Sequence, residues 1–373
     1  MIFNGYVMSG EETVAEVKNN QTIPILKEKM PLYLANGGNF EQWLESRAID
    51  RHRPNSRILK KMLHLTDTSD IASVIHSHAA TITDNYWVKS VEEDLQYANI
   101  EFKENIFADI SLTGSVDSYN KIFTKEQLSS RTPELTNIGS YEKCWKFENG
   151  SWYMYKQGSA LERFSEVFIA ILSKKLGFPT AEYYPSDSFI KTKDFTEGKY
   201  NFEPMAALVG DNEDYSFNYD KLNVIDENLA HQYLDILFMD TLCFNMDRHT
   251  YNYGLLRDRE LGNIISMAPN FDNNIALISR GYATEAKNSS NLLIELFGEL
   301  LKNKNILYEI PFINETMVQE IAIKSLPNEK IDIEYVTDFV MDRYQRIESL
   351  VQSLEMNPKE DLGIQFKYKK YLW

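Results

Sequence analysis

The chain has 373 residues, of which 43% are hydrophobic and 13% aromatic, and this content is enough to bury a substantial core in a folded protein. Its formal net charge of −16 at pH 7 argues against nucleic acid or a membrane surface as the principal partner, because both are polyanions bound by clustered Lys and Arg side chains. The two cysteines, Cys144 and Cys243, form no CxxC pair, and neither a signal-peptide pattern nor a run of 18 apolar residues occurs, so we expect a soluble cytoplasmic protein without a zinc site or a disulfide framework.

Residues 1–128 are expected to form a first region, ahead of the parts that carry the candidate chemistry. A strand-like start is followed by two stretches, 37–49 and 54–65, with apolar residues at helical spacing, and Asn55 with Ser56 can cap the second. We therefore expect two helices that pack together. From about residue 81, a composition rich in Asn, Asp, Ser and aromatic residues predicts loops and short strands.

Residues 129–210 predict a small mixed lobe with the order strand, turn, strand, helix, strands. Apolar and polar residues alternate on both sides of Asn149–Gly150, which is a strong signal for a two-residue hairpin turn. A helix is expected next, stopped by Gly177 and Pro179. Its apolar residues recur at helical spacing: Leu161, Phe164, Phe168, Ile169, Leu172 and Leu176.

Residues 211–373 predict a larger, mainly helical lobe. A buried helix over 226–242 leads into the polar stretch CFNMDRHTYNYG, and residues 262–277 predict a short strand pair or turn. Further helices are expected over 291–303, 314–326 and 334–354. The predicted fold class is α+β, with two lobes, of which a small mixed one precedes a large, mainly helical one.

Three oxygen-bearing side chains of the helical lobe have the spacing that phosphoryl transfer requires. Asp247 and Asn252 reproduce the D-x-x-x-x-N spacing of the protein-kinase catalytic loop, and Asp272 follows in APNFDNN after a predicted strand. A base, an amide ligand and a second acid are the minimum equipment for this reaction, and hard oxygen ligands suit Mg²⁺ better than zinc.

The small lobe supplies candidates for binding nucleotide phosphates. Gly139 and Ser140 form a predicted tight turn whose backbone N–H groups can approach phosphates, and Lys143 follows. Lys156 ends the second hairpin strand, where a lysine can reach a cleft between the lobes and neutralise phosphate charge.

Three further positions complete this set. Glu166 on the following helix is a candidate ion-pair partner for Lys156, with Glu162 as the rival. Glu203 and Met205 lie where a connection between lobes would contact an adenine edge through its backbone. Taken singly, each of these residues has a structural interpretation as a cap, a turn or a solvated charge. Their order along the chain, which is the order a two-lobed kinase needs, favours the functional one.

With these motifs the chain resembles the HipA-like serine/threonine kinases, a bacterial family whose fold is related to phosphatidylinositol 3/4-kinases. The matching stretches are GSYEKCW, WYMYKQG, SEVFIAILSKKLGFPTAEYY, NMDRHTYNYG and APNFDNN, which fall in the family's order from roughly residue 135 to 275. The resemblance implies an N-terminal accessory region over 1–128, a kinase N-lobe over 129–210 and a helical C-lobe over 211–373.

The resemblance also implies roles for individual residues. Asp247 would be the catalytic base, Asn252 and Asp272 would hold Mg²⁺, and Lys156 and Lys143 would contact ATP. His249, which by itself is more simply a hydrogen-bonded structural group, matches a family position beside the base that supports the loop. Family members often autophosphorylate a serine of the phosphate loop, for which Ser140 is the first candidate and Ser151 the second.

The sequence therefore predicts an ATP- and Mg²⁺-dependent kinase acting on a serine or threonine hydroxyl of a protein. Family members commonly act as toxins paired with a DNA-binding antitoxin, so the resemblance implies a HipB-like antitoxin as a candidate partner. The net charge of −16 predicts that the chain itself does not bind nucleic acid directly. Two alternatives remain at this point: a kinase for a small molecule such as a lipid head group or an aminoglycoside, and a non-catalytic pseudokinase that serves as an interaction module.

Overall fold

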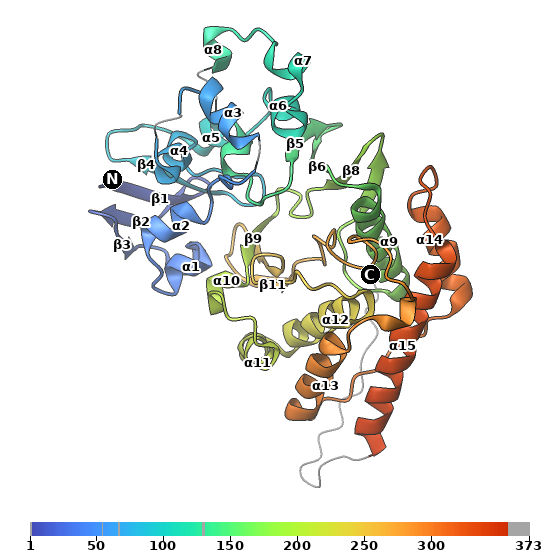
Figure 1. The fold of residues 1–373 in the computed structure, drawn as a ribbon. Helices are drawn as coiled ribbons and strands as arrows, with labels where there is room; N and C mark the ends of the chain where they lie inside the picture. The colour runs from blue at the N-terminus through green and yellow to red at the C-terminus, as the bar shows by residue number, and fades with distance from the viewer. Residues whose placement is uncertain (1, 54, 66–67, 129–130, 357–373) are drawn as a thin grey trace. The chain divides into compact units, whose positions relative to one another are not determined.

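The computed structural model describes residues 2–53, 55–65, 68–128 and 131–356 (Figure 1). Its contacts divide the chain into two compact units: unit 1 contains residues 1–158, 184–208 and 254–268, and unit 2 contains residues 159–183, 209–253 and 269–373. The predicted boundaries at 128 and 210 do not coincide with these units and stay a prediction. Residues 129–130 at the first boundary and 357–373 at the end of the predicted C-lobe lie outside the described residues.

Unit 1 begins with a four-stranded antiparallel sheet, which is more extensive than the single strand-like start that we predicted. Three consecutive strands form a meander, and a fourth joins from later in the chain, in the order β3-β2-β1-β4. The strands are β1 (Gly5–Ser9), β2 (Glu12–Lys18), β3 (Gln21–Pro24) and β4 (Tyr86–Ser90). Residues of β1, β2 and β4 enter one apolar cluster that includes Val7, Val14 and Val88.

The two helices predicted in the first region are present, but they do not pack on each other. Helix α2 (Phe40–Glu45) buries its apolar side chains in the cluster of the first sheet. Helix α3 (Ser56–Met62) buries Leu59 in a separate cluster. The predicted side-chain cap of α3 is also wrong. Asn55 occupies the cap position, but its side chain makes no capping hydrogen bond, and its amide donates to the Glu142 carboxylate instead.

The predicted hairpin is confirmed. Strands β5 (Lys143–Glu148) and β6 (Ser151–Lys156) pair through a turn in which Asn149 and Gly150 both have positive φ, 50° and 80°. Such angles match the twist of a two-residue hairpin and suit Asn-Gly. The hairpin continues into a second sheet, in the order β5-β6-β8-β7, through β8 (Phe189–Lys193) and β7 (Tyr183–Ser186).

Of the strands predicted after the helix, β7 and β8 thus belong to the second sheet, and β9 (Tyr200–Pro204) belongs to a third sheet. The third sheet has the order β11-β10-β9; β11 (Ile264–Met267) lies in the stretch 262–277 predicted as a strand pair or turn, and β10 (Gly254–Asp258) was not predicted. Unit 1 also contains short helices: α1 (Leu32–Ala35), α4 (Asp70–His76), α5 (Tyr97–Ile100), α6 (Ala108–Thr113), α7 (Val116–Tyr119) and α8 (Lys125–Leu128).

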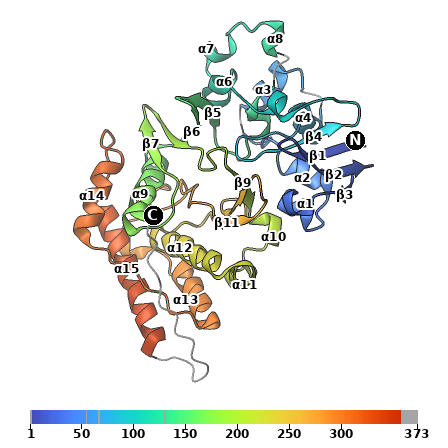
Figure 2. The same cartoon turned by 180° about the vertical axis from the view of Figure 1, so that it is seen from behind.

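Unit 2 is helical, as predicted for the second half of the chain, and Figure 2 shows its helices from behind. Its main helices are α9 (Ala160–Leu176), α11 (Tyr215–Ile225), α12 (Glu227–Cys243), α13 (Leu292–Lys304), α14 (Glu315–Ser325) and α15 (Ile333–Met356), while α10 (Ala206–Val209) precedes α11. A capping box of Ser159 and Glu162 starts α9, and Gly177 in the left-handed region ends it. The long helices are found where the apolar spacing predicted them.

Within the part of the chain that the structure describes, no helix combines the length and the apolar character needed to cross a bilayer.

Candidate catalytic and phosphate loops

The predicted catalytic loop leaves α12 through Phe244, whose φ of 53° and ψ of 51° end the helix in the left-handed region. Side-chain amides then fold the loop on itself. Asn245 Oδ1 accepts the backbone N–H of Asp247 at 3.2 Å, and Asn252 Nδ2 donates to the Asp247 carbonyl at 2.9 Å. Asp247 lies between these two bonds with its side chain exposed, as a group that receives a substrate proton needs to be.

Arg248 is the central side chain of this region, and its role was not predicted. Its guanidinium is buried and makes a bidentate pair with Asp240 of α12, with nitrogen–oxygen distances of 2.8 Å. It also donates to the Oδ1 atoms of Asn270 at 2.9 Å and Asn273 at 2.7 Å. Because the five N–H donors of arginine have a fixed planar geometry, these partners are held in one arrangement.

The same guanidinium brings together the two segments that carry the predicted metal ligands. Arg248 Nη1 donates to the carbonyls of Asn252 and Phe271, each at 2.8 Å, so the residue before Asp272 lies beside Asn252. Asp272 itself has a φ of 61°, and its N–H donates to the Tyr183 hydroxyl at 3.2 Å.

The electrostatics of Arg248 agree with this convergence. Burial alone would lower its pKa, but the carboxylates of Asp240, Asp272 and Glu166 outweigh burial and hold the pKa above its ordinary value. Asp272 and Glu166 therefore both act on Arg248 electrostatically. Glu166 is fully buried on α9, which agrees with the predicted core-facing side of that helix. Its predicted ion pair with Lys156, and the rival pair through Glu162, stay predictions.

His249 makes hydrogen bonds within the loop. Its Nδ1 accepts the N–H of Tyr251 at 3.3 Å, its own N–H donates to the Asp247 carbonyl at 3.0 Å, and its carbonyl accepts from Asn252.

Among the described residues there is no group of three or more His, Cys, Asp or Glu side chains that could hold a metal ion. One carboxylate with one amide oxygen fits Mg²⁺, which binds few protein ligands and completes its shell with water and phosphates.

The predicted phosphate loop shows a second convergence, within unit 1. Gly139 has a φ of 109°, and a Cβ at this position would collide with the Lys143 ammonium group. The lysine side chain therefore folds back over the glycine. In the hairpin register, Lys143 is directly opposite Lys156, which places the two predicted phosphate-binding lysines next to each other on one face of the sheet. Like charges directly opposite each other repel.

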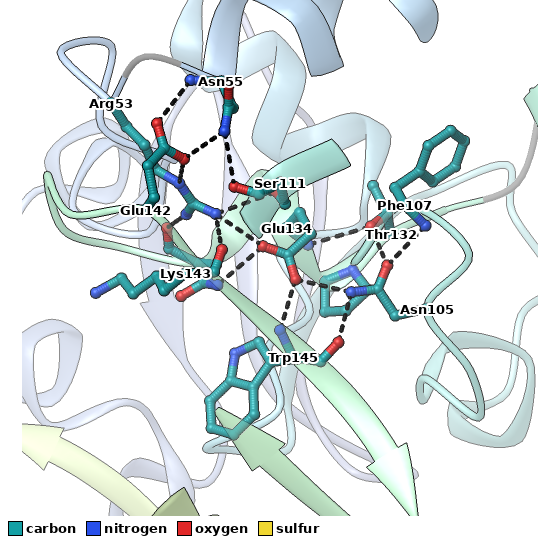
Figure 3. A network of polar contacts seen from close by, with 12 residues as sticks. Arg53, Asn55, Asn105, Phe107, Ser111, Thr132, Glu134, Glu142, Lys143 and Trp145 are labelled. Atoms are coloured by element: carbon teal, nitrogen blue, oxygen red, sulfur yellow. Dashed lines mark hydrogen bonds and ion pairs between the residues drawn. The ribbon is translucent and has the colours of Figure 1, made fainter. Parts of the chain in front are cut away.

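A network of buried polar side chains holds the predicted phosphate loop in place (Figure 3). Arg53 pairs with Glu134 at 3.1 Å, and neither side chain is exposed. Arg53 also donates to the carbonyls of Asn137, at 3.2 Å, and Lys143, so it bonds the backbone at both ends of the segment 137–143. Glu134 in turn accepts the N–H of Trp145 at 2.7 Å, which fixes the start of β5.

Glu142 attaches the same loop to the start of α3. Its carboxylate accepts the backbone N–H of Asn55 at 3.0 Å and the Asn55 side-chain amide at 2.8 Å. Burial raises the pKa of Glu142, although these donors and Arg53 act in the opposite direction. This contact explains why Asn55 does not cap α3.

The remaining predicted site residues have different surroundings. Glu203 is buried, and its carboxylate accepts from Arg257 at 2.9 Å, the Tyr86 hydroxyl at 2.8 Å and the Leu32 N–H at 3.0 Å. Its side chain is thus part of the unit 1 core. Met205 is fully buried, and its carbonyl accepts from Leu208. The backbone role predicted for both residues at an adenine stays a prediction.

The two candidate autophosphorylation sites also differ. Ser140 is exposed in the phosphate loop, whereas Ser151 is half-buried at the start of β6, beside the hairpin turn. Exposure favours Ser140, as the sequence did, and its modification stays a prediction.

The chain was compared with known proteins. No protein-family model matches it, and no curated protein matches it either. HipA of Shewanella oneidensis MR-1, solved in its toxin–antitoxin complex with HipB and operator DNA, aligns over 95% of this chain and 99% of that chain, with a TM-score of 0.57 and 11% sequence identity. The Helicobacter pylori proinflammatory kinase CtkA aligns over 57% of this chain and 94% of that chain, with a TM-score of 0.43 and 18% identity. The HipA match confirms the predicted fold: the chain has a HipA-like kinase fold of mixed α+β class.

Proposed function

We propose that the chain is an ATP- and Mg²⁺-dependent kinase that transfers the γ-phosphoryl group to a serine or threonine hydroxyl of a protein. The observation that carries the proposal is the pair of hydrogen bonds that Arg248 Nη1 donates to the carbonyls of Asn252 and Phe271. It brings the loop with the base beside the segment with the second acid, which is the arrangement of parts that kinase chemistry uses.

Each residue then has a defined task. The Asp247 carboxylate accepts the proton of the acceptor hydroxyl as that oxygen forms its bond to the γ-phosphorus. Asn252 donates its Nδ2 to the loop backbone, so its Oδ1 is the atom available for a cation, and the Asp272 carboxylate is the second ligand. Mg²⁺, when bound, neutralises charge on the phosphates. Lys143 and Lys156 bind phosphate oxygens and offset their charge.

We also propose a HipB-like antitoxin as a protein partner. The support is the HipA-like fold, together with the fact that the Shewanella HipA structure contains HipB and operator DNA. With a net charge of −16, this chain is not expected to bind DNA by itself.

The acceptor class is tested by mapping phosphorylated residues after incubation with MgATP, alone and with a bacterial lysate. We expect phosphoserine or phosphothreonine on a protein with the parent chain and its loss with Asp247→Asn. The matched control is Glu213→Gln, which neutralises an exposed acid of the same unit and should behave as the parent. Label confined to a small molecule would favour the alternative acceptor, and full activity of Asp247→Asn would contradict the proposed base.

A further inference from the structure

Two arginines of α15 converge on one serine hydroxyl in the segment that precedes α13. Arg343 Nη1 donates to Ser289 Oγ at 3.1 Å, and Arg346 Nη2 donates to the same atom at 2.8 Å. Arg346 also donates to the Ser289 carbonyl at 3.2 Å. A neutral hydroxyl is a weak acceptor for two cations, whereas phosphate oxygens are the acceptors that guanidinium groups bind best.

The cluster has more positive than negative charge. Arg343 is fully buried, and its other partners are the carbonyls of Thr241 and Ser290. Arg346 pairs with Asp342, but within the described ranges no carboxylate forms an ion pair with Arg343. Burial, and next the like charge of Arg346, lower the pKa of Arg343 to about 10.

Two further features prepare this place for an anion. The Nε of Arg346 is buried and lacks a hydrogen-bond acceptor among the residues described here, so this N–H group can donate to an added phosphate oxygen. Ser289 also lies just ahead of α13, a helix of 13 residues, whose positive N-terminal end favours negative charge. Asn291 occupies the cap position without capping, because its Oδ1 accepts from Arg346 at 2.5 Å.

We propose that Ser289 is a phosphorylation site and that Arg343 and Arg346 bind the phosphoserine. In the modification, Ser289 Oγ forms a bond to the γ-phosphorus of ATP, the bond from that phosphorus to the bridging oxygen breaks, ADP leaves, and the hydroxyl proton passes to a base. The proposal holds whichever ATP-dependent serine kinase performs the transfer, and it does not require the chain to be its own kinase.

The consequence reaches the end of α12. Arg343 donates to the Thr241 carbonyl from two nitrogens, at 2.8 Å and 2.7 Å, and its guanidinium lies 4.8 Å from the ring centre of Phe244, the residue that ends α12. A dianion on Ser289 would fix this guanidinium between the segment before α13 and the helix end that leads into the catalytic loop. Phosphorylation would therefore order the start of that loop.

The proposal is tested on the full chain with phosphoserine encoded at position 289. The matched control carries phosphoserine at position 353, an exposed residue of α15 whose hydroxyl donates only to its own helix, to the Leu350 carbonyl. We expect phosphoserine at 289 to raise the thermal midpoint by roughly 2–4 °C and phosphoserine at 353 to leave it unchanged. The gain should disappear in the Arg346→Gln background. No gain at 289, or the same gain in that background, would overturn the proposal.

A second measurement does not depend on how well the arginine variant folds. In a phosphorus NMR titration, the second phosphate pKa at position 289 should lie below that at position 353, because two nearby guanidinium groups favour the dianion. Identical titrations at the two positions would equally overturn the proposal.

Discussion

The catalytic loop and the phosphate loop are both held by a buried arginine, but the two arginines draw on different parts of the chain. Among the described residues, the hydrogen-bond partners of Arg248 all lie within 25 residues of it. The partners of Arg53 in the phosphate-loop network lie 58 to 90 residues further along. One loop is thus assembled from its own neighbourhood, and the other depends on a distant region.

This difference indicates that the first region of the chain supports the phosphate loop. Residues 1–158 fall within one compact unit, and Arg53 and Asn55 bond the phosphate loop directly. The N-terminal region therefore forms part of the support for phosphate binding, and its removal would leave Glu134 buried without its cation. The hydrogen-bond partners of Arg248 given above, in contrast, all fall in unit 2.

The largest expected effect is that of Arg248→Gln. Without the guanidinium, buried Asp240 keeps one side-chain donor, Asn245, and breaking a buried pair in this way costs about 3–5 kcal/mol of unfolding free energy. Phosphoryl transfer should be lost as well. Urea unfolding measures the change, and Arg280→Gln, at an exposed arginine of the same unit, should stay within about 0.5 kcal/mol of the parent. A loss below about 1 kcal/mol for Arg248→Gln would contradict its central role.

Arg53→Gln should cost less, about 3 kcal/mol, at the low end of the same range. Glu134 keeps three donors after the change, from Trp145, Asn105 and Asn137, and these compensate part of its charge. Hydrogen exchange separates the two regions: this variant should lose protection over 137–148 and keep it in α12. Equal loss in both regions would remove the distinction between a locally and a distantly supported loop.

Asp235→Asn tests the stability cost of a half-buried carboxylate of α12 that has no arginine among its described hydrogen-bond partners. Burial raises the pKa of Asp235 to about 7, and its hydrogen bond is with the Tyr308 hydroxyl at 3.0 Å. Since the folded pKa exceeds the unfolded value near 3.9, the stabilisation is complete below pH 4 and is lost as pH rises through about 7. The asparagine variant should be more stable at pH 8, by about 1–3 kcal/mol, with a flatter profile from pH 4 to 7. An unchanged slope would show that Asp235 does not titrate there.

The smallest effect on stability is expected for Lys143→Gln. Removing one of two opposed lysines relieves a cross-strand repulsion of about 0.2–1 kcal/mol, so the unfolding free energy should hardly fall. ATP binding should nevertheless weaken about tenfold or more, because a charged hydrogen bond to phosphate is lost. Calorimetric titration with MgATP measures this, with Lys146→Gln on the same strand as the control. Unchanged ATP affinity would remove Lys143 from the site.

Local signals were sufficient for the elements that they predict. Asn149–Gly150 fixes its turn through its own φ angles, and the apolar spacing of α9, α12, α13 and α15 fixes those helices. Helix α11 was not predicted individually, because its stretch YSFNYDKLNVI mixes polar and apolar residues and buries Asn218 beside Tyr219 and Leu222.

The supports of the two loops could not be predicted, because they join separate segments of the chain, over up to 25 residues for Arg248 and up to 90 residues for Arg53. Arg248 lies within the motif NMDRH, but the sequence does not show that it donates hydrogen bonds to Asn270, Phe271 and Asn273; only the fold does. The same holds for Arg53, whose partners are separated from it by whole helices. It also holds for Asn55, which was predicted to cap α3 but donates to Glu142. Sequence spacing can identify candidate chemical groups, but not the arginines that position them.

The most direct test of the central claim is a single-turnover measurement of ADP formation from MgATP by the parent and by Asp247→Asn, with ATP affinity measured alongside. We predict that both bind ATP equally and that the variant transfers phosphoryl about 10²–10⁴-fold more slowly, because only the proton acceptor has been removed. Equal rates in the two proteins would contradict the assignment of the loop around Asp247 as the catalytic centre.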